Sequence, residues 1–126
     1  MHRFAELMNV TAMEDASIAE AGELMFASHE SYKVCGLTEP RTDSIVERAR
    51  DSRDKGLFGA RITGGGSGGT VVVLARRGSR NAIDELADQL AGGHGERPYL
   101  FHGSSPGCSM VRPLILRCET SRKVAE

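Results

Sequence analysis

The spacing of apolar residues in the first part of the chain predicts two helices. Positions three or four residues apart carry the side chains expected to face a core: Ile18, Ala21, Met25, Ser28 and Tyr32. A capping box from Thr11 to Glu14 precedes them, so the longer helix should begin there and end near Gly36. A shorter helical stretch at residues 4–8 should pack on the same core.

Two further helices are expected downstream. Pro40 suits a helix start and Gly56 its stop, which gives a helix of about four turns. Ser79 suits the N-cap of the last helix, and the glycines at residues 92–93 suit its stop. The apolar stripe of that helix is clear: Ile83, Leu86, Ala87 and Leu90.

The remaining apolar stretches predict strands. Ala60, Ile62 and residues 71–74 are apolar and largely β-branched, as in strands, and a glycine-rich corner separates the two stretches. Short strands are also expected at Tyr99–Phe101 and Val111–Leu116. The resulting order, α-α-β-β-α-β-β, lacks regular strand–helix alternation. It favours an α+β fold in which helices cover one face of an antiparallel sheet.

Glycine dominates the corner between the first two strands. Five of the six residues from Gly64 to Gly69 are glycine, and each glycine in regular structure costs roughly 0.5–1 kcal/mol relative to alanine. The residues alone leave two interpretations open, a nest of backbone amides that binds an anion and a plain hairpin loop. The GxGxxG spacing within the corner is not a dinucleotide fingerprint, because a strand follows it rather than a helix.

Composition limits the classes of function. The 126 residues are expected to form a single domain, 1–126, and the formal charge of −1 gives no reason to expect nucleic acid or an anionic membrane as a partner. Three distant cysteines and four histidines show no disulfide or metal-site spacing. No apolar run reaches the ~18 residues of a membrane span. We therefore expect a soluble, cytoplasmic protein without a metal site.

Three segments together resemble the C-terminal domain of the GHMP kinases, the family of galacto-, homoserine, mevalonate and phosphomevalonate kinases. They are ELMFASHESY at Glu23–Tyr32, GLFGARITGGGSGGTVVVLA at Gly56–Ala75 and GSSPG at Gly103–Gly107. The resemblance is greatest to the sugar 1-kinase branch, galactokinase- and arabinokinase-like, and implies a ferredoxin-like α+β fold. Galactokinases usually carry an aromatic residue where Ser67 stands and often a cysteine where Thr70 stands, so galactose itself is in doubt.

The resemblance also implies a role for the glycine-rich hairpin. Its residues would lie beside the phosphate and substrate of an ATP-dependent sugar kinase: Thr63, Gly64, Gly65, Gly66, Ser67, Gly68, Gly69 and Thr70. The complete kinase would use ATP and Mg²⁺. No catalytic or metal-binding residue is assigned, because Asp43 is better explained as a helix-start charge and Arg61 as a solvated strand edge. His29 matches a family position and is interpreted as structural.

The ATP-binding N-terminal domain of the family has no counterpart in these residues, which leads to three hypotheses. The chain is the C-terminal half of a sugar kinase that needs a separate N-terminal GHMP kinase domain, so that alone it is inactive and binds no cofactor strongly. Alternatively, it is a non-catalytic module that binds a sugar phosphate or similar metabolite. Under the third hypothesis it is an interaction domain, and a homo-oligomer is expected when it is isolated.

Overall fold

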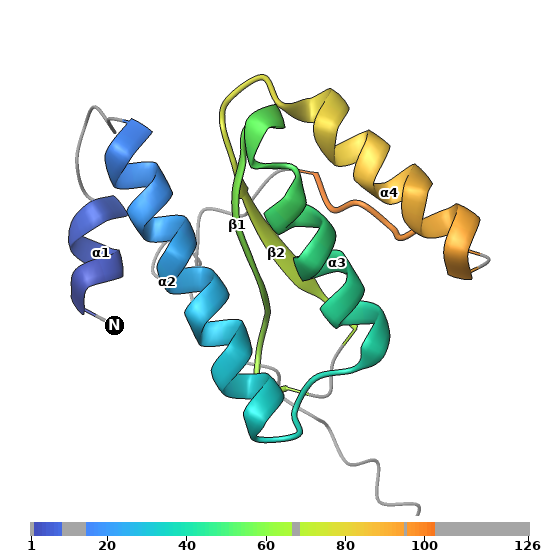
Figure 1. Cartoon of the computed structure of the whole chain (residues 1–126), viewed down its shortest axis with the longest axis horizontal. Helices are drawn as coiled ribbons and strands as arrows, with labels where there is room; N and C mark the ends of the chain where they lie inside the picture. Colours follow the sequence, from blue (N-terminus) through green and yellow to red (C-terminus); the bar gives the residue numbers. More distant parts are fainter. Residues whose placement is uncertain (1, 9–14, 67–68, 95, 103–126) are drawn as a thin grey trace, which may run out of the picture.

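A computed structural model describes residues 2–8, 15–66, 69–94 and 96–102 of the chain. Its elements are α1 (His2–Met8), α2 (Asp15–Val34), α3 (Pro40–Asp51), a 3-10 turn at Arg53–Lys55, β1 (Leu57–Ile62), β2 (Val71–Ala75) and α4 (Arg80–His94). Helices α2 and α3 pack on β1, α1 packs on α2, and α4 lies beside α3 (Figure 1).

The described helices match the predicted ones in number and order, but α3 ends at Asp51, before its predicted stop at Gly56. Helix α2 ends in a left-handed Gly36 with φ 69°, as expected from the glycine. The amide of Leu37 then donates to the carbonyl of Tyr32 at 3.0 Å, which satisfies a carbonyl of the last turn. Helix α3 begins at Pro40, and the 3-10 turn carries the chain to Gly56, where φ is 86°. The capping box predicted at 11–14 lies outside the described residues.

The predicted stop of the last helix is wrong by two residues. Helix α4 includes Gly92 and continues to His94. Gly92 is not among the glycines with positive φ, and a glycine ends a helix only where the backbone turns left-handed. Its presence therefore weakens the helix without stopping it.

The two described strands form an antiparallel pair. Leu57 lies opposite Ala75 and Ile62 opposite Val71, with a bulge between Leu57 and Gly59. The core lies between this pair and the helices, and its buried members come from both: Phe26, Val46, Ala49, Leu57, Ala60, Ala82, Leu86 and Leu90. This arrangement confirms the predicted α+β class with an antiparallel sheet.

The strand predicted at Tyr99–Phe101 does not form. These residues have no regular structure, and the rings of Tyr99 and Phe101 make a T-shaped pair with centroids 4.9 Å apart. A strand exists only through hydrogen bonds to a neighbour, and aromatic composition indicates nothing about a neighbour. The segments 103–107 and 111–116 lie outside the described residues. Among the helices that are described, none is both long and apolar enough to cross a membrane.

Candidate functional site

The glycine-rich hairpin joins β1 to β2 and is closed at its base by backbone bonds. The amide of Thr63 donates to the carbonyl of Thr70 at 3.0 Å, directly after the last strand pair. The backbone then turns through positive φ at Gly64 (72°) and Gly66 (94°), where residues with a Cβ would be strained. The described members of the predicted set are thus held together at one end of the strand pair.

Two contacts fix the hairpin to the rest of the domain. The hydroxyl of Tyr32 in α2 donates to the carbonyl of Gly64 at 3.1 Å. A Cβ added to Gly66 would lie 2.7 Å from the Cβ of Leu37, so only glycine lets the hairpin approach the turn after α2 this closely. The hairpin is therefore oriented by α2 and is not an independent loop.

Other parts of the hairpin have open space around them. A Cβ added to Gly64, Gly65 or Gly69 would meet nothing within 4 Å. Gly65 and Gly69 also lack positive φ, so neither packing nor backbone conformation requires glycine at these two positions. Ser67 and Gly68 lie outside the described residues. Open space therefore surrounds these positions within the described part of the hairpin.

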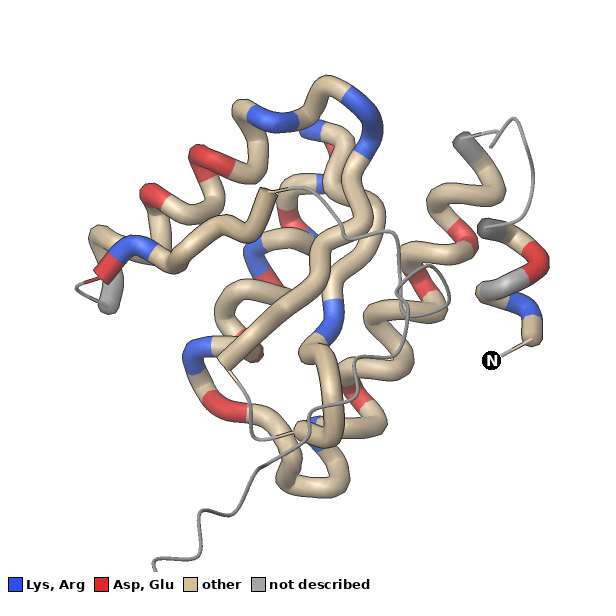
Figure 2. The backbone as a smooth tube through the Cα atoms, turned by 180° about the vertical axis from the view of Figure 1, so that it is seen from behind, with Lys and Arg blue, Asp and Glu red and all other residues tan. Residues whose placement is uncertain are grey.

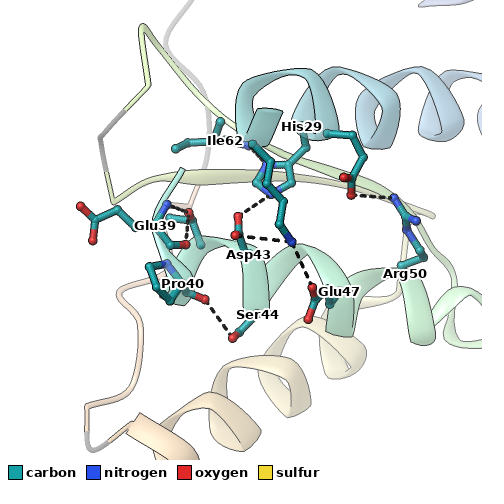
Figure 3. Close-up of polar contacts among 11 residues, drawn as sticks. His29, Glu39, Pro40, Asp43, Ser44, Glu47, Arg50 and Ile62 are labelled. Carbon is teal, nitrogen blue, oxygen red and sulfur yellow. Dashed lines mark hydrogen bonds and ion pairs between the residues drawn. The ribbon is translucent and has the colours of Figure 1, made fainter. Parts of the chain in front are cut away.

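His29 connects the base of the hairpin to two helices (Figure 3). Its side chain is only 2% exposed. The amide of Ile62 donates to Nδ1 at 3.3 Å, so the proton lies on Nε2, which faces Asp43 Oδ1 at 3.0 Å. Lys33 Nζ lies 3.6 Å from Asp43 Oδ2, and this carboxylate is the main reason that the pKa of Lys33 is raised.

This geometry revises the interpretation of Asp43. The residue does lie in the first turn of α3, but its carboxylate also joins α3 to α2 through His29 and Lys33. His29 and Asp43 are 14 residues apart in sequence, and no rule of helix or strand spacing predicts a contact at that separation. A buried histidine that matches a motif position was the available signal, and its partner could be identified only from the packing.

The structure also corrects the interpretation of Arg61 as a solvated strand edge. Arg61 lies opposite Val72 in the strand pair, and its side chain is half-buried. Its Nε donates to the carbonyl of Ile62 at 3.0 Å, and its guanidinium carbon lies 5.5 Å from the centre of the Tyr32 ring. The hairpin base therefore has a cation beside it that is held by the strand and by α2.

Comparison with known sequences agrees with the motifs. The sequence model described as "GHMP kinases C terminal" matches residues 9–92. The chain belongs to the GHMP kinases. L-arabinokinase of Arabidopsis thaliana is 36% identical over 116 residues, which are 85% of this chain and 11% of that protein. Galactokinase of Thermosipho africanus is 32% identical over 109 residues, 84% of this chain and 30% of that protein.

The match to galactokinase of Pasteurella multocida is 43% identical over 84 residues, 65% of this chain and 22% of that protein. The chain thus spans between 11% and 30% of the length of these three relatives. The matched family region and the sugar kinase relatives confirm the predicted resemblance to the C-terminal domain of the family.

The described residues were compared with the side chains that hold metal ions and with turns that bind anions. No group of three or more histidine, cysteine, aspartate or glutamate side chains gathers to hold a metal within the described ranges. The hairpin, by contrast, presents glycine backbone beside Thr63, whose hydroxyl donates to the carbonyl of Thr70 at 3.4 Å. Backbone amides in such turns suit anions.

Proposed function

We propose that this domain is the C-terminal part of an ATP-dependent sugar kinase, and that residues 63–70 bring backbone amides to the transferred phosphoryl group. The observation that carries the proposal is the combination found at the hairpin. It is anchored at Gly64 and Gly66, yet Gly65 and Gly69 have open space and no conformational need for glycine. Family membership and the two kinds of sugar kinase among the relatives support the same conclusion.

The chemistry requires little more than positioning. The bond between the γ-phosphorus and the bridging oxygen of ATP breaks as a sugar hydroxyl oxygen bonds to that phosphorus and loses its proton, which yields ADP, a sugar phosphate and a proton. The transferred group carries negative charge on its oxygens throughout, so oriented N–H donors stabilise it without covalent chemistry. In this proposal the hairpin supplies such donors, and a side chain at Gly65 or Gly69 would block the approach.

We assign nucleotide binding, metal binding and catalytic side chains to the parts of a complete kinase outside this domain. By resemblance to the family, ATP and Mg²⁺ would be held mainly by an N-terminal GHMP kinase domain. No catalytic residue is assigned to this chain. We expect the isolated domain to be inactive and to bind ATP with Mg²⁺ weakly.

A chimeric kinase tests the proposal. This domain would replace the region that it matches in the galactokinase of Thermosipho africanus, and galactose-dependent ADP formation would be measured. Activity of the chimera is expected, and Gly65→Val should lower it by about 100-fold or more, as the loss of an oxyanion donor does. Gly92→Val, a matched change at an open glycine in α4, is the control. A folded chimera without sugar-dependent turnover would argue against the kinase assignment.

A binding module without chemistry is the second candidate. It is favoured by the fact that the anchors of the hairpin, Tyr32 and Leu37, belong to this chain itself. A sugar phosphate should then raise the melting temperature of the isolated domain by mass action, while ATP with Mg²⁺ adds nothing further. Absence of any shift with sugar phosphates would exclude this candidate.

Self-association is proposed for the isolated domain. Tyr99 and Phe101 are 79% and 76% exposed, and paired aromatic rings on a surface favour contact with another protein. Light scattering after size-exclusion chromatography should report a mass above that of one chain. Tyr99→Ser with Phe101→Ser should return the protein to a monomer, whereas a monomeric parent protein would refute the proposal.

A further inference from the structure

One charged residue lies on the two strands, and it has no counter-ion among the described residues. The strands read LFGARI and VVVLA, so Arg61 is their single charge. Figure 2 shows that the other charges gather on helices and turns. The interactions of Arg61 within the described part of the chain are the bond to the carbonyl of Ile62 and the contact with the Tyr32 ring, and neither neutralises its charge.

These two contacts orient the guanidinium group. Nε is engaged at 3.0 Å, whereas the two terminal nitrogens make no hydrogen bond within the described residues and remain available as donors. Tyr32, which lies under the guanidinium, also donates to Gly64 of the hairpin. Arg61 and the hairpin are therefore positioned by the same side chain, and a ligand that contacts one lies near the other.

Arg61 lines a groove of about 740 Å³ between α2 and the strands. Thr63 and Gly64 of the hairpin line the same groove, as does Ser28 of α2, and much of the remaining lining is apolar. Arg3 is the other cation on the described lining, and it is already paired with Glu20 at 2.8 Å. A mostly apolar groove with a few convergent polar groups is typical of small-molecule sites.

We propose that Arg61 binds the phosphate group of a phosphorylated small molecule, a sugar phosphate or a nucleotide, in this groove. A half-buried guanidinium without an anion is unfavourable, and its planar fork matches phosphate oxygens in a bidentate arrangement. The hairpin residues 63–70 contain no charged side chain, so Arg61 supplies the full positive charge that the backbone amides lack. The inference rests on the proposed function because the hairpin forms one wall of the groove.

Calorimetric titration of the full chain tests this assignment, with inorganic phosphate, a hexose 1-phosphate and ATP as separate probes. Arg61→Gln should raise the Kd of the probe that binds by about 10- to 100-fold, the range for a hydrogen-bonded charge. Arg61→Lys keeps the charge but not the fork and should give an intermediate loss. The matched control is Arg77→Gln, an exposed arginine in the turn after β2 that does not line the groove.

Each outcome decides the proposal. Equal effects of Arg61→Gln and Arg77→Gln, or no binding of any probe to the unmodified chain, would overturn it. If Arg61→Gln does not fold, Arg61→Lys replaces it, and an unchanged Kd in that variant overturns the proposal. The hexose 1-phosphate and ATP arms identify the source of the phosphate.

Gly65→Val in the same titration separates this inference from the hairpin function. Loss of binding with Arg61→Gln alone would support the groove and remove the hairpin from the site. Loss with Gly65→Val alone would retain the hairpin and overturn the role of Arg61. We expect both variants to lose binding, which would place the phosphate between Arg61 and the hairpin.

Discussion

Glycine serves opposite purposes in two regions of this domain. Where α2 packs on β1, a Cβ added to Gly22 would lie 2.0 Å from the carbonyl oxygen of Phe58, and one added to Gly59 would lie 2.5 Å from the Cα of Gly22. At the hairpin, a Cβ on Gly65 or Gly69 would meet nothing within 4 Å. The first region needs glycine so that a helix and a strand can touch, whereas these two hairpin positions do not need it for packing.

The contrast separates residues that maintain the fold from residues that are open to a ligand. Gly66 belongs with the first group, because it packs on Leu37 and has φ 94°. A substitution at Gly66 could lower binding simply by disturbing the fold, so its effect on function could not be read separately. Gly65 is therefore the better position at which to test function, although the sequence presents the two glycines as equivalent.

The largest expected effect is at the helix–strand contact. Gly22→Ala should lower the free energy of unfolding by about 3 kcal/mol or more, because α2 must move away from β1 to accommodate the methyl group. Gly92→Ala in α4 is the control, and it should be neutral or slightly stabilising since its Cβ has open space. Urea denaturation of the two variants measures the difference, and equal stabilities would show that α2 and β1 are not in close contact.

Next is the histidine at the base of the hairpin. His29→Ala should lower the free energy of unfolding by about 2–3 kcal/mol, because the amide of Ile62 and the carboxylate of Asp43 lose a buried partner. Hydrogen exchange at the Ile62 amide should accelerate. Ser31→Ala, which removes only a bond to Ala27 within α2, is the control. Unchanged protection of Ile62 would contradict the assigned bond.

Within the hairpin, the comparison predicts a smaller difference between adjacent glycines. Gly66→Ala should cost about 1–3 kcal/mol of stability, from the left-handed backbone and the contact with Leu37. Gly65→Ala should change stability by less than about 0.5 kcal/mol, as surface substitutions usually do. Thermal unfolding of both variants measures this difference. If Gly65→Ala proves as harmful as Gly66→Ala, the hairpin is packed more tightly than described.

The smallest effect concerns the contact between α1 and α2, which includes a surface ion pair between Arg3 and Glu20 in place of a close glycine contact. Hydrogen bonds from Arg3 hold the pKa of Glu20 below its ordinary value. Since the folded pKa is the lower one, this contribution is present above the unfolded pKa and is lost as pH falls below about 4. Glu20→Gln should flatten the melting-temperature profile slightly in this range. An identical profile for the variant would show that the pair contributes nothing.

Local patterns predicted most of the elements. The apolar period from Ile18 to Tyr32 and the glycine at 36 correspond to α2 and its end, and Pro40 marks the first residue of α3. The hairpin and its flanking strands were predicted from β-branched residues around a glycine cluster. Each of these signals depends on residues within a few positions of one another, so the chain itself contains the necessary information.

Predictions that depended on a distant partner were less successful. Tyr99–Phe101 has the composition of a strand but lacks a strand neighbour in the described structure. Asp43 was interpreted from local context as a helix-start charge and Arg61 as a solvated strand edge, yet Asp43 also bonds a buried histidine and Arg61 is held beside Tyr32. A strand, an ion pair or a ring contact requires two segments to meet, and sequence spacing does not specify which segments those are.

The sequence by itself determined the helices, the β1–β2 hairpin and the membership of the chain in the GHMP kinases, because periodicity, turn chemistry and motif order follow the chain and do not depend on which segments meet in the fold. Only the tertiary structure decided which glycines are packed and which are open, and which polar side chains face the hairpin. Those distinctions depend on contacts between residues such as Gly22 and Gly59 or His29 and Ile62, which become neighbours only when α2 packs on β1.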